Sequence, residues 1–233
     1  MRTYEHLMNS VYECLQYSQA GDCPSDTYGP IREWDVSHVT DMHVVFSWAS
    51  NFDQDLSEWN VNKVTNMENM FSYAIAFNSD LSKWNVGHVT DMRLMFRDAT
   101  RFNGDVSTWN VGRVINMERM FRGNVFFNQD LSKWNVNKVT NMAYMFHGAK
   151  EFNQNISKWN VGQVTDMEGM FIAASSFKQE LCGGAWIHSK ANQRDMFFGS
   201  PGSIANRGRS SSQSSFHPQN KDDLVAAVKA CKL

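Results

Sequence analysis

The chain lacks several features that would assign it to a common functional class. Its 233 residues carry 22 Lys and Arg against 24 Asp and Glu, so no bulk charge attracts nucleic acid or membrane. No apolar run approaches the roughly 18 residues that cross a bilayer, and the N-terminus has no apolar signal-peptide core. We therefore expect a soluble protein that stays inside the cell, or a mature form or excerpt of a longer product.

Motifs of the common enzyme classes are missing as well. The sequence has no phosphate-cradling glycine loop, no H-E-x-x-H and no G-x-S-x-G. Its 7 histidines are scattered and no Cys-x-x-Cys is present, so neither a zinc site nor any other cofactor is predicted. We predict that the chain is not an enzyme, with hydrolysis and ice binding as distant alternatives.

The chain has 4 cysteines, and all of them lie outside its regular part: Cys14, Cys23, Cys182 and Cys231. Cys14 and Cys23 are a candidate disulfide that would tie down the N-terminal region. Nine residues of separation alone do not decide whether that bond forms. The redox compartment is therefore left open.

What the chain has instead is a repeat of 25 residues. The copy Phe52–Phe71 reads F-D-Q-D-L-S-E-W-N-V-N-K-V-T-N-M-E-N-M-F, and Phe77–Phe96 repeats it closely. Six tryptophans mark the interval: Trp34, Trp59, Trp84, Trp109, Trp134 and Trp159. One copy offers too few apolar side chains for a core of its own, so the copies must stack. We expect the tryptophans to lie in that core, although a stacked aromatic row is also able to hold sugar rings.

Two local patterns recur within each copy. Leu56, Trp59 and Val61 follow the L-x-x-L-x-L spacing of a leucine-rich repeat, which predicts a short strand. Val64, Met67, Phe71 and Ala74 follow a helical rhythm. The pairs Thr65–Glu68 and Thr165–Glu168 are typical of helix capping boxes.

The predicted fold is an α/β repeat solenoid, with leucine-rich-repeat-like coils of one short parallel strand and one short helix. A right-handed parallel β-helix is the alternative. We predict an N-terminal capping helix and loop over residues 1–30 and six repeats over 31–180. A degenerate capping repeat over 181–205 and a Ser-rich linker with a short helical segment over 206–233 would follow.

The motifs of Phe127–Phe146 and Tyr28–Met42 resemble those of the BspA-like leucine-rich-repeat surface proteins. The resemblance covers about residues 28–180. It implies an extracellular or surface-displayed binding module, some of whose relatives adhere to matrix proteins or other cells. Two departures are the missing signal segment and the fourth copy, in which Ile115 and Asn124 replace Thr and Ala.

A fixed period aligns equivalent side chains into rows on the surface. One row is mostly basic: His38, Lys63, His88, Arg113, Lys138 and Gln163. A second row turns basic toward the C-terminal half: Glu33, Glu58, Lys83, Thr108, Lys133 and Lys158. Together they are a candidate strip for an anionic polysaccharide or acidic protein, and solvated charge that keeps this face soluble is the favoured interpretation.

Polar rows flank that strip. One is a row of amides: Asn60, Asn85, Asn110, Asn135 and Asn160. Another is acidic, with Asp55, Asp80, Asp105 and Asp130. The acidic row is a weak calcium candidate, and side chains that accept turn N–H groups are the simpler interpretation.

Three further features lie off the strip. Trp48 and Tyr73 share one repeat position and are candidate contact residues. Asn155 begins the one glycosylation sequon. Near the C-terminus, Leu224, Val228 and Cys231 repeat the spacing of α-helical positions near the N-terminus, which predicts either a second array or an ordinary amphipathic helix.

The sequence thus predicts a non-enzymatic repeat module that recognises a protein or polysaccharide ligand, of adhesion type and displayed at the surface. The alternative is a structural subunit of a larger assembly, such as a cell-surface layer, a virion or an organelle complex. Neither nucleic acid nor membrane insertion is expected.

Overall fold

A computed structural model describes residues 3–24 and 29–205. The tail predicted over 206–233, with Leu224, Val228 and Cys231, lies outside these residues. The elements in chain order are helix α1 (Tyr4–Tyr17), the 3-10 helix η1 (Ile31–Glu33), strand β1 (Glu180–Leu181), helix α2 (Gly184–Ile187) and strand β2 (Ser203–Ile204). None of these helices is long and apolar enough to cross a membrane.

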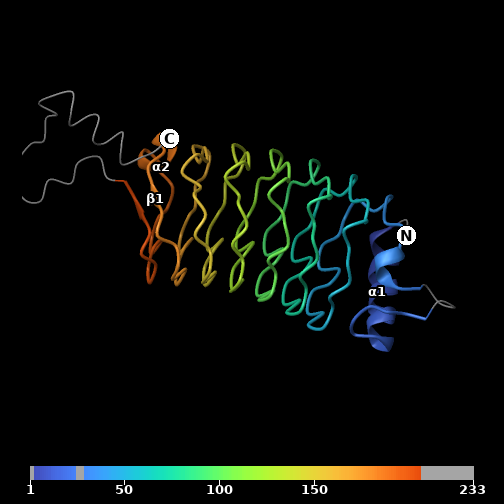
Figure 1. The fold of residues 1–233 in the computed structure, drawn as a ribbon. Helices are drawn as coiled ribbons and strands as arrows, with labels where there is room; N and C mark the ends of the chain where they lie inside the picture. The colour runs from blue at the N-terminus through green and yellow to red at the C-terminus, as the bar shows by residue number, and fades with distance from the viewer. Residues whose placement is uncertain (1–2, 25–28, 206–233) are drawn as a thin grey trace, which may run out of the picture.

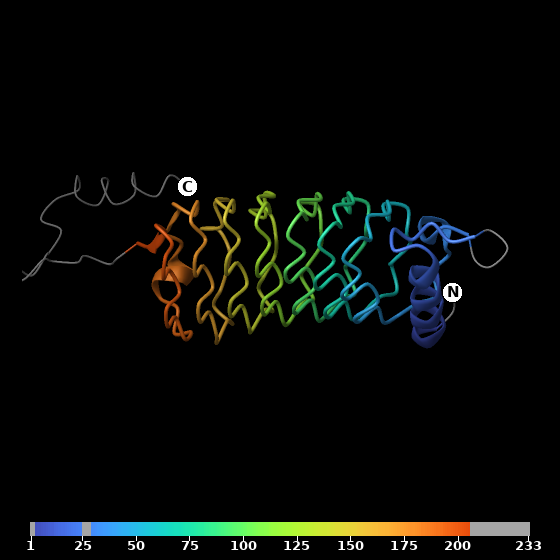
Figure 2. The same ribbon diagram turned by 90° about the horizontal axis from the view of Figure 1, so that it is seen from below.

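Helix α1 lies at the N-terminal end of an elongated stack of coils (Figures 1 and 2). The Thr3 hydroxyl caps it by accepting the His6 N–H at 3.2 Å. Leu7 and Val11 on its inner face are buried against the first coil. Cys14 and Cys23 form a disulfide that fastens the helix to the segment that follows it.

The coils run in register from one end of the stack to the other (Figure 1). Isolated parallel bridges mark one row of the stack: Asp41, Asn66, Asp91, Asn116, Asn141, Asp166 and Asn192. At the C-terminal end β1 pairs with β2 in parallel, with Glu180 opposite Ser203 and Leu181 opposite Ile204. The repeating pattern of hydrogen bonds therefore continues past residue 180 into the segment expected as a degenerate cap.

The short strand expected at Leu56–Val61 is absent, because tight turns take its place. Asp55 Oδ1 accepts the Ser57 N–H at 2.9 Å, and Asn60 Oδ1 accepts the Asn62 N–H at 3.2 Å. Between them the Trp59 N–H bonds to the Leu56 carbonyl at 3.0 Å. Each of these side chains accepts a hydrogen bond from the backbone N–H two residues later. Such bonds bend the chain into a turn, so a strand ladder does not form.

The helix expected at residues 64–74 does not form either. Alternate N–H groups leave the segment and bond to the next coil, as Met67 does to the Asp91 carbonyl at 3.0 Å and Phe71 to the Met95 carbonyl at 2.8 Å. Asn69 and Tyr73 have positive φ angles of 55° and 59°, which a right-handed helix cannot contain. The backbone here bonds between coils rather than within one.

The expected capping boxes are therefore wrong. The Thr65 hydroxyl donates to the Thr40 carbonyl of the previous coil at 3.1 Å, and Thr165 does the same to Thr140 at 3.0 Å. Glu68 accepts a bond from Arg93 of the next coil instead of reaching back to Thr65. These side chains link neighbouring coils, and no helix starts there.

The six periodic tryptophans lie in the core, with exposed fractions from 2% to 7%. Successive rings stack, as Trp84 does on Trp109 with centroids 6.4 Å apart. Buried phenylalanines stack likewise, with Phe71 and Phe96 at 5.5 Å. The core is therefore a continuous column of apolar rings, and the tryptophans are not available to sugars.

Candidate functional site

Two positions of every coil have a left-handed backbone, and the second of them carries the side chains of interest. Its φ angles lie between 54° and 72° at Trp48, Tyr73, Asp98, Gly123, Gly148 and Ala173. Glycine adopts this conformation freely, whereas other residues are strained there by roughly 1 kcal/mol or more. The first two coils place large aromatic side chains at this strained position, which later coils fill with small residues or Asp98.

The two aromatic side chains form a stacked pair on the surface. The ring centroids of Trp48 and Tyr73 are 3.9 Å apart, with an angle of 14° between the planes. Trp48 is 70% exposed, whereas Tyr73 is half-buried. A large exposed indole held in one orientation is typical of a contact site.

A chain of polar contacts continues from this pair along the stack. Arg97 donates to the Tyr73 hydroxyl at 2.6 Å, and its guanidinium carbon lies 4.9 Å from the centre of the Tyr73 ring. Arg97 also pairs with Asp98 at 3.1 Å, and Arg122 approaches the same carboxylate at 3.4 Å. The orientation of Tyr73 is therefore fixed by ionic contacts of the next two coils.

A groove of about 240 Å³ lies between α1 and the first coil, beside the aromatic pair. On one side it is lined by Tyr12 and Gln16 of α1 and by Gln19 just after the helix, and on the other by Trp48, Ser50 and Asn51 of the coil. Asn51 donates a hydrogen bond to Gln19, which joins the two sides. The sequence predicted a capping helix at the N-terminus but not the groove, because the groove depends on how the helix packs against the first coil.

The basic strip predicted from the sequence lies on the surface, where each of its side chains is exposed. Glu58 and Lys83 form an ion pair, and this hydrogen bond raises the pKa of Lys83. Lys133, Lys138 and Lys158 make no ion pair with any residue within the described ranges. Thr108 donates to the Ser82 carbonyl at 2.8 Å. Lys63 and Arg113 make no ion pair with a described residue either, so the strip has unpaired positive charge along its length and most of it in the C-terminal half.

The amide row beside the strip is exposed and forms turns. Asn85 Oδ1 accepts the Gly87 N–H at 3.1 Å, and the same bond recurs at Asn110, Asn135 and Asn160. These side chains fix the backbone, and the residues that carry them are exposed. The remaining basic row is exposed as well: His38, Lys63, His88 and Arg113.

The side chains of the acidic row accept hydrogen bonds from backbone N–H groups. Asp55, Asp80, Asp105 and Asp130 each accept the N–H of the serine two residues on, at 2.8–2.9 Å. That bond lowers the pKa of Asp55 and of Asp130. No group of three or more His, Cys, Asp or Glu able to hold a metal occurs in residues 3–24 and 29–205. Asn155 continues the row and is exposed, whereas Ile156 and Ser157 of its sequon are buried.

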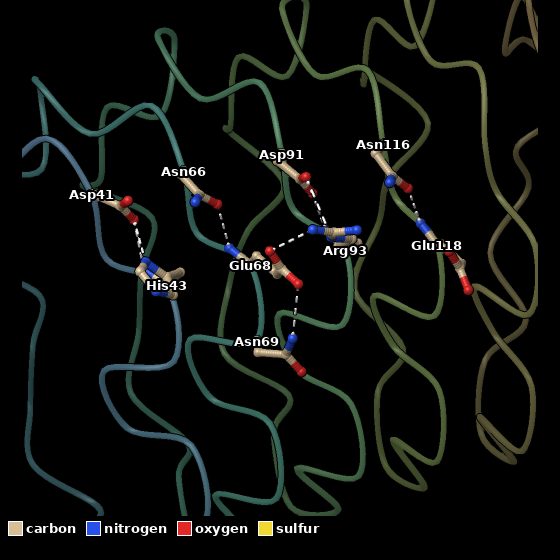
Figure 3. A network of polar contacts seen from close by, with 9 residues as sticks. All are labelled: Asp41, His43, Asn66, Glu68, Asn69, Asp91, Arg93, Asn116 and Glu118. Carbon is tan, nitrogen blue, oxygen red and sulfur yellow. Dashed lines mark hydrogen bonds and ion pairs between the residues drawn. The ribbon is translucent and has the colours of Figure 1, made fainter.

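A network on the bridge row was missed by the sequence analysis (Figure 3). Arg93 donates to Glu68 at 2.7 Å and approaches Asp91 at 3.4 Å. Burial raises the pKa of Asp91. The alternation of Glu68, Arg93 and Glu118 at one repeat position was the available signal, and the capping-box interpretation of Glu68 obscured it.

The comparisons with known proteins assign a family and no activity. A family model described as Mycoplasma protein of unknown function, DUF285, matches residues 16–125 and again residues 104–207. No curated protein and no solved structure matches the chain. The two family matches overlap and together extend from α1 through the last coil.

Proposed function

The chain belongs to the DUF285 family of repeat proteins, and from that premise we propose that it is a non-enzymatic recognition module. It binds an anionic polysaccharide or an acidic protein surface through the exposed strip of its coils. Asp55, Asp80, Asp105 and Asp130 recur with the repeat as turn residues, which favours a structural role for this acidic row over catalysis. The stack acts as a solenoid, whose length suits an extended partner.

One observation carries the proposal: Lys133, Lys138 and Lys158 are exposed, close in register and unpaired within the described part of the chain. Charges that are not paired internally are available to a ligand, and a row of them attracts an extended anion. The turns beneath them are held by side-chain hydrogen bonds, as at Asp130 and Asn135. Little ordering is therefore needed when a ligand binds.

Surface display is part of the proposal, in keeping with the resemblance to BspA-like surface proteins. The Cys14–Cys23 disulfide supports it, because structural disulfides persist in oxidising compartments. The exposed side chain of Asn155, the acceptor residue of the sequon, is compatible with such a compartment.

An array of matrix proteins, anionic glycans and neutral glycans, probed at low and high salt, tests the proposal. We expect saturable binding to anionic members that weakens as salt rises. Combined replacement of Lys133, Lys138 and Lys158 by Ala should abolish it. The matched control replaces three exposed cations outside the strip, Arg101, Lys150 and Lys178, and should bind as the wild type does.

The alternative function is a structural subunit of a larger assembly. The strip favours it in one respect, because Glu33 and Glu58 lie toward one end and Lys133 and Lys158 toward the other. Such a surface is complementary to a copy of itself displaced along the stack. A size that increases with protein concentration in light scattering, without array binding, would support assembly over recognition.

A further inference from the structure

The groove between α1 and the first coil has the composition of a sugar-binding site. Its lining contains the Trp48 indole, amide side chains from both sides and hydroxyl groups, and none of its lining residues is charged. We propose that this groove binds one neutral sugar ring, such as the terminal residue of a glycan. The proposal rests on the recognition function above but uses a different surface.

Trp48 gives the groove an exposed aromatic wall. Its backbone N–H bonds to the Ser72 carbonyl of the following coil at 2.8 Å, and Tyr73 of that coil covers one face of its ring. Helix α1 lies on the opposite side, at the N-terminal end of the stack (Figure 1). The side of the indole that faces the groove therefore remains accessible to the apolar C–H face of a sugar.

The remaining lining supplies hydrogen-bonding groups for hydroxyls. Gln16 is exposed on α1, and Ser47 and Ser50 flank Trp48 on the coil. Amides both donate and accept, as hydroxyls do, which matches a polyhydroxylated ligand without charge. A charged ligand would find no partner here, so the neutral class is favoured over the anionic class proposed for the strip.

The groove is fixed before any ligand arrives. Tyr73 is held by Arg97, which Asp98 holds in turn, while the Cys14–Cys23 disulfide and the Asn51–Gln19 bond secure α1. A preorganised wall reduces the ordering cost of binding.

The volume limits the ligand to about one ring. Pockets for drug-sized ligands span roughly 300–1,000 Å³, whereas this groove measures about 240 Å³. A single ring offers few atoms for contact, so we expect dissociation constants in the millimolar range. A longer glycan would gain affinity only by contacts outside the groove.

Ligand-observed NMR titration with the methyl glycosides of glucose, galactose, mannose and N-acetylglucosamine tests the proposal on the full chain. We expect at least one glycoside to bind saturably. Trp48→Ala should weaken that binding at least about tenfold, and Gln16→Ala should weaken it less. Trp48→Phe keeps an aromatic wall and should retain most of the binding.

The control is Phe198→Ala, which removes another exposed ring, 72% accessible, far along the chain from the groove. It should bind the glycoside as the wild type does. The proposal is overturned if no glycoside binds, or if Trp48→Ala and Gln16→Ala both bind unchanged. A parallel titration with a sulfated polysaccharide separates the two sites: if it binds while every glycoside fails, the groove assignment is wrong and the recognition function stands.

Discussion

The indole N–H of Trp84 donates a hydrogen bond to the main-chain carbonyl of Leu56, 2.9 Å away in the previous coil. The same bond recurs at Trp109 and Trp134, with acceptors Leu81 and Val106. Each tryptophan therefore both fills the core and satisfies a buried carbonyl of its neighbour. The periodic tryptophan is a connection between coils, which explains why another aromatic ring does not replace it.

Trp109→Phe should destabilise the protein by about 2–4 kcal/mol. It removes one of the two donors to the Leu81 carbonyl, which keeps the Trp84 N–H at 3.0 Å, and it creates a void in the ring column. The midpoint and slope of urea denaturation measure the loss. Trp48→Phe, at the exposed position, should change stability by less than about 0.5 kcal/mol. Equal effects of the two substitutions would contradict the role given to the buried indole.

Asn124→Ala should stabilise the protein by about 1 kcal/mol. Asn124 is fully buried, and although its amide donates to the Phe96 carbonyl at 2.6 Å, its own Oδ1 has no partner. Other coils have Ala at this position, and the Phe96 carbonyl retains the bond from the Ala99 N–H at 3.1 Å. Removal of a buried unpaired acceptor relieves a desolvation cost. The reverse change, Ala99→Asn, should lower the melting temperature.

Gly148→Ala should cost about 1 kcal/mol although it has room for a methyl group. No atom lies closer than 3.7 Å to the added Cβ, but the φ angle of 70° is unfavourable for an L-residue. Gly184→Ala is the control, because nothing lies within 4 Å and its φ angle is ordinary. Chemical denaturation of the two variants isolates the conformational cost. Equal denaturation midpoints for the two variants would show that the left-handed position of Gly148 is not strained for an L-residue.

Acid should weaken the turns of the acidic row. The Ser57 and Ser132 N–H groups lower the folded-state pKa of Asp55 and Asp130, so these carboxylates stabilise the fold above the unfolded pKa. This stability is lost as pH falls below about 4, through the folded pKa values. The double variant Asp55→Asn and Asp130→Asn should lose less on acidification, because Asn155 forms the same turn without titrating. Melting temperatures at neutral and acid pH compare the two chains, and identical losses would contradict the prediction.

The sequence predicted the repeat and its core but not the conformation of its coils. A 25-residue interval of Trp and Phe requires stacked copies, since each copy alone exposes its apolar face. The spacing of Met67 and Phe71 predicted a helix, because apolar periodicity indicates which side chains point inward. It does not indicate whether the backbone N–H groups bond within one coil or to the next coil. Bonding between coils satisfies the same N–H groups that a helix would satisfy within itself.

Signals for the actual conformation were present but indirect. Asp55, Asn60 and Asn66 each precede a turn by accepting an N–H two residues on. The recurring left-handed position can be recognised in the sequence only when Gly123 and Gly148 are aligned with Trp48. A tryptophan at that position does not suggest a positive φ angle. The 25-residue period of the sequence predicted the exposed rows. The groove depends on how α1 packs against the first coil, and no sequence pattern predicts that packing.

The most direct test of the recognition function is hydrogen–deuterium exchange of the chain with and without a sulfated polysaccharide. We predict slower amide exchange in the turns around Lys133, Lys138 and Lys158, with no change around Lys150 and Lys178. Protection confined to the second pair, or none at a saturating concentration of the polysaccharide, would contradict a recognition surface on the strip.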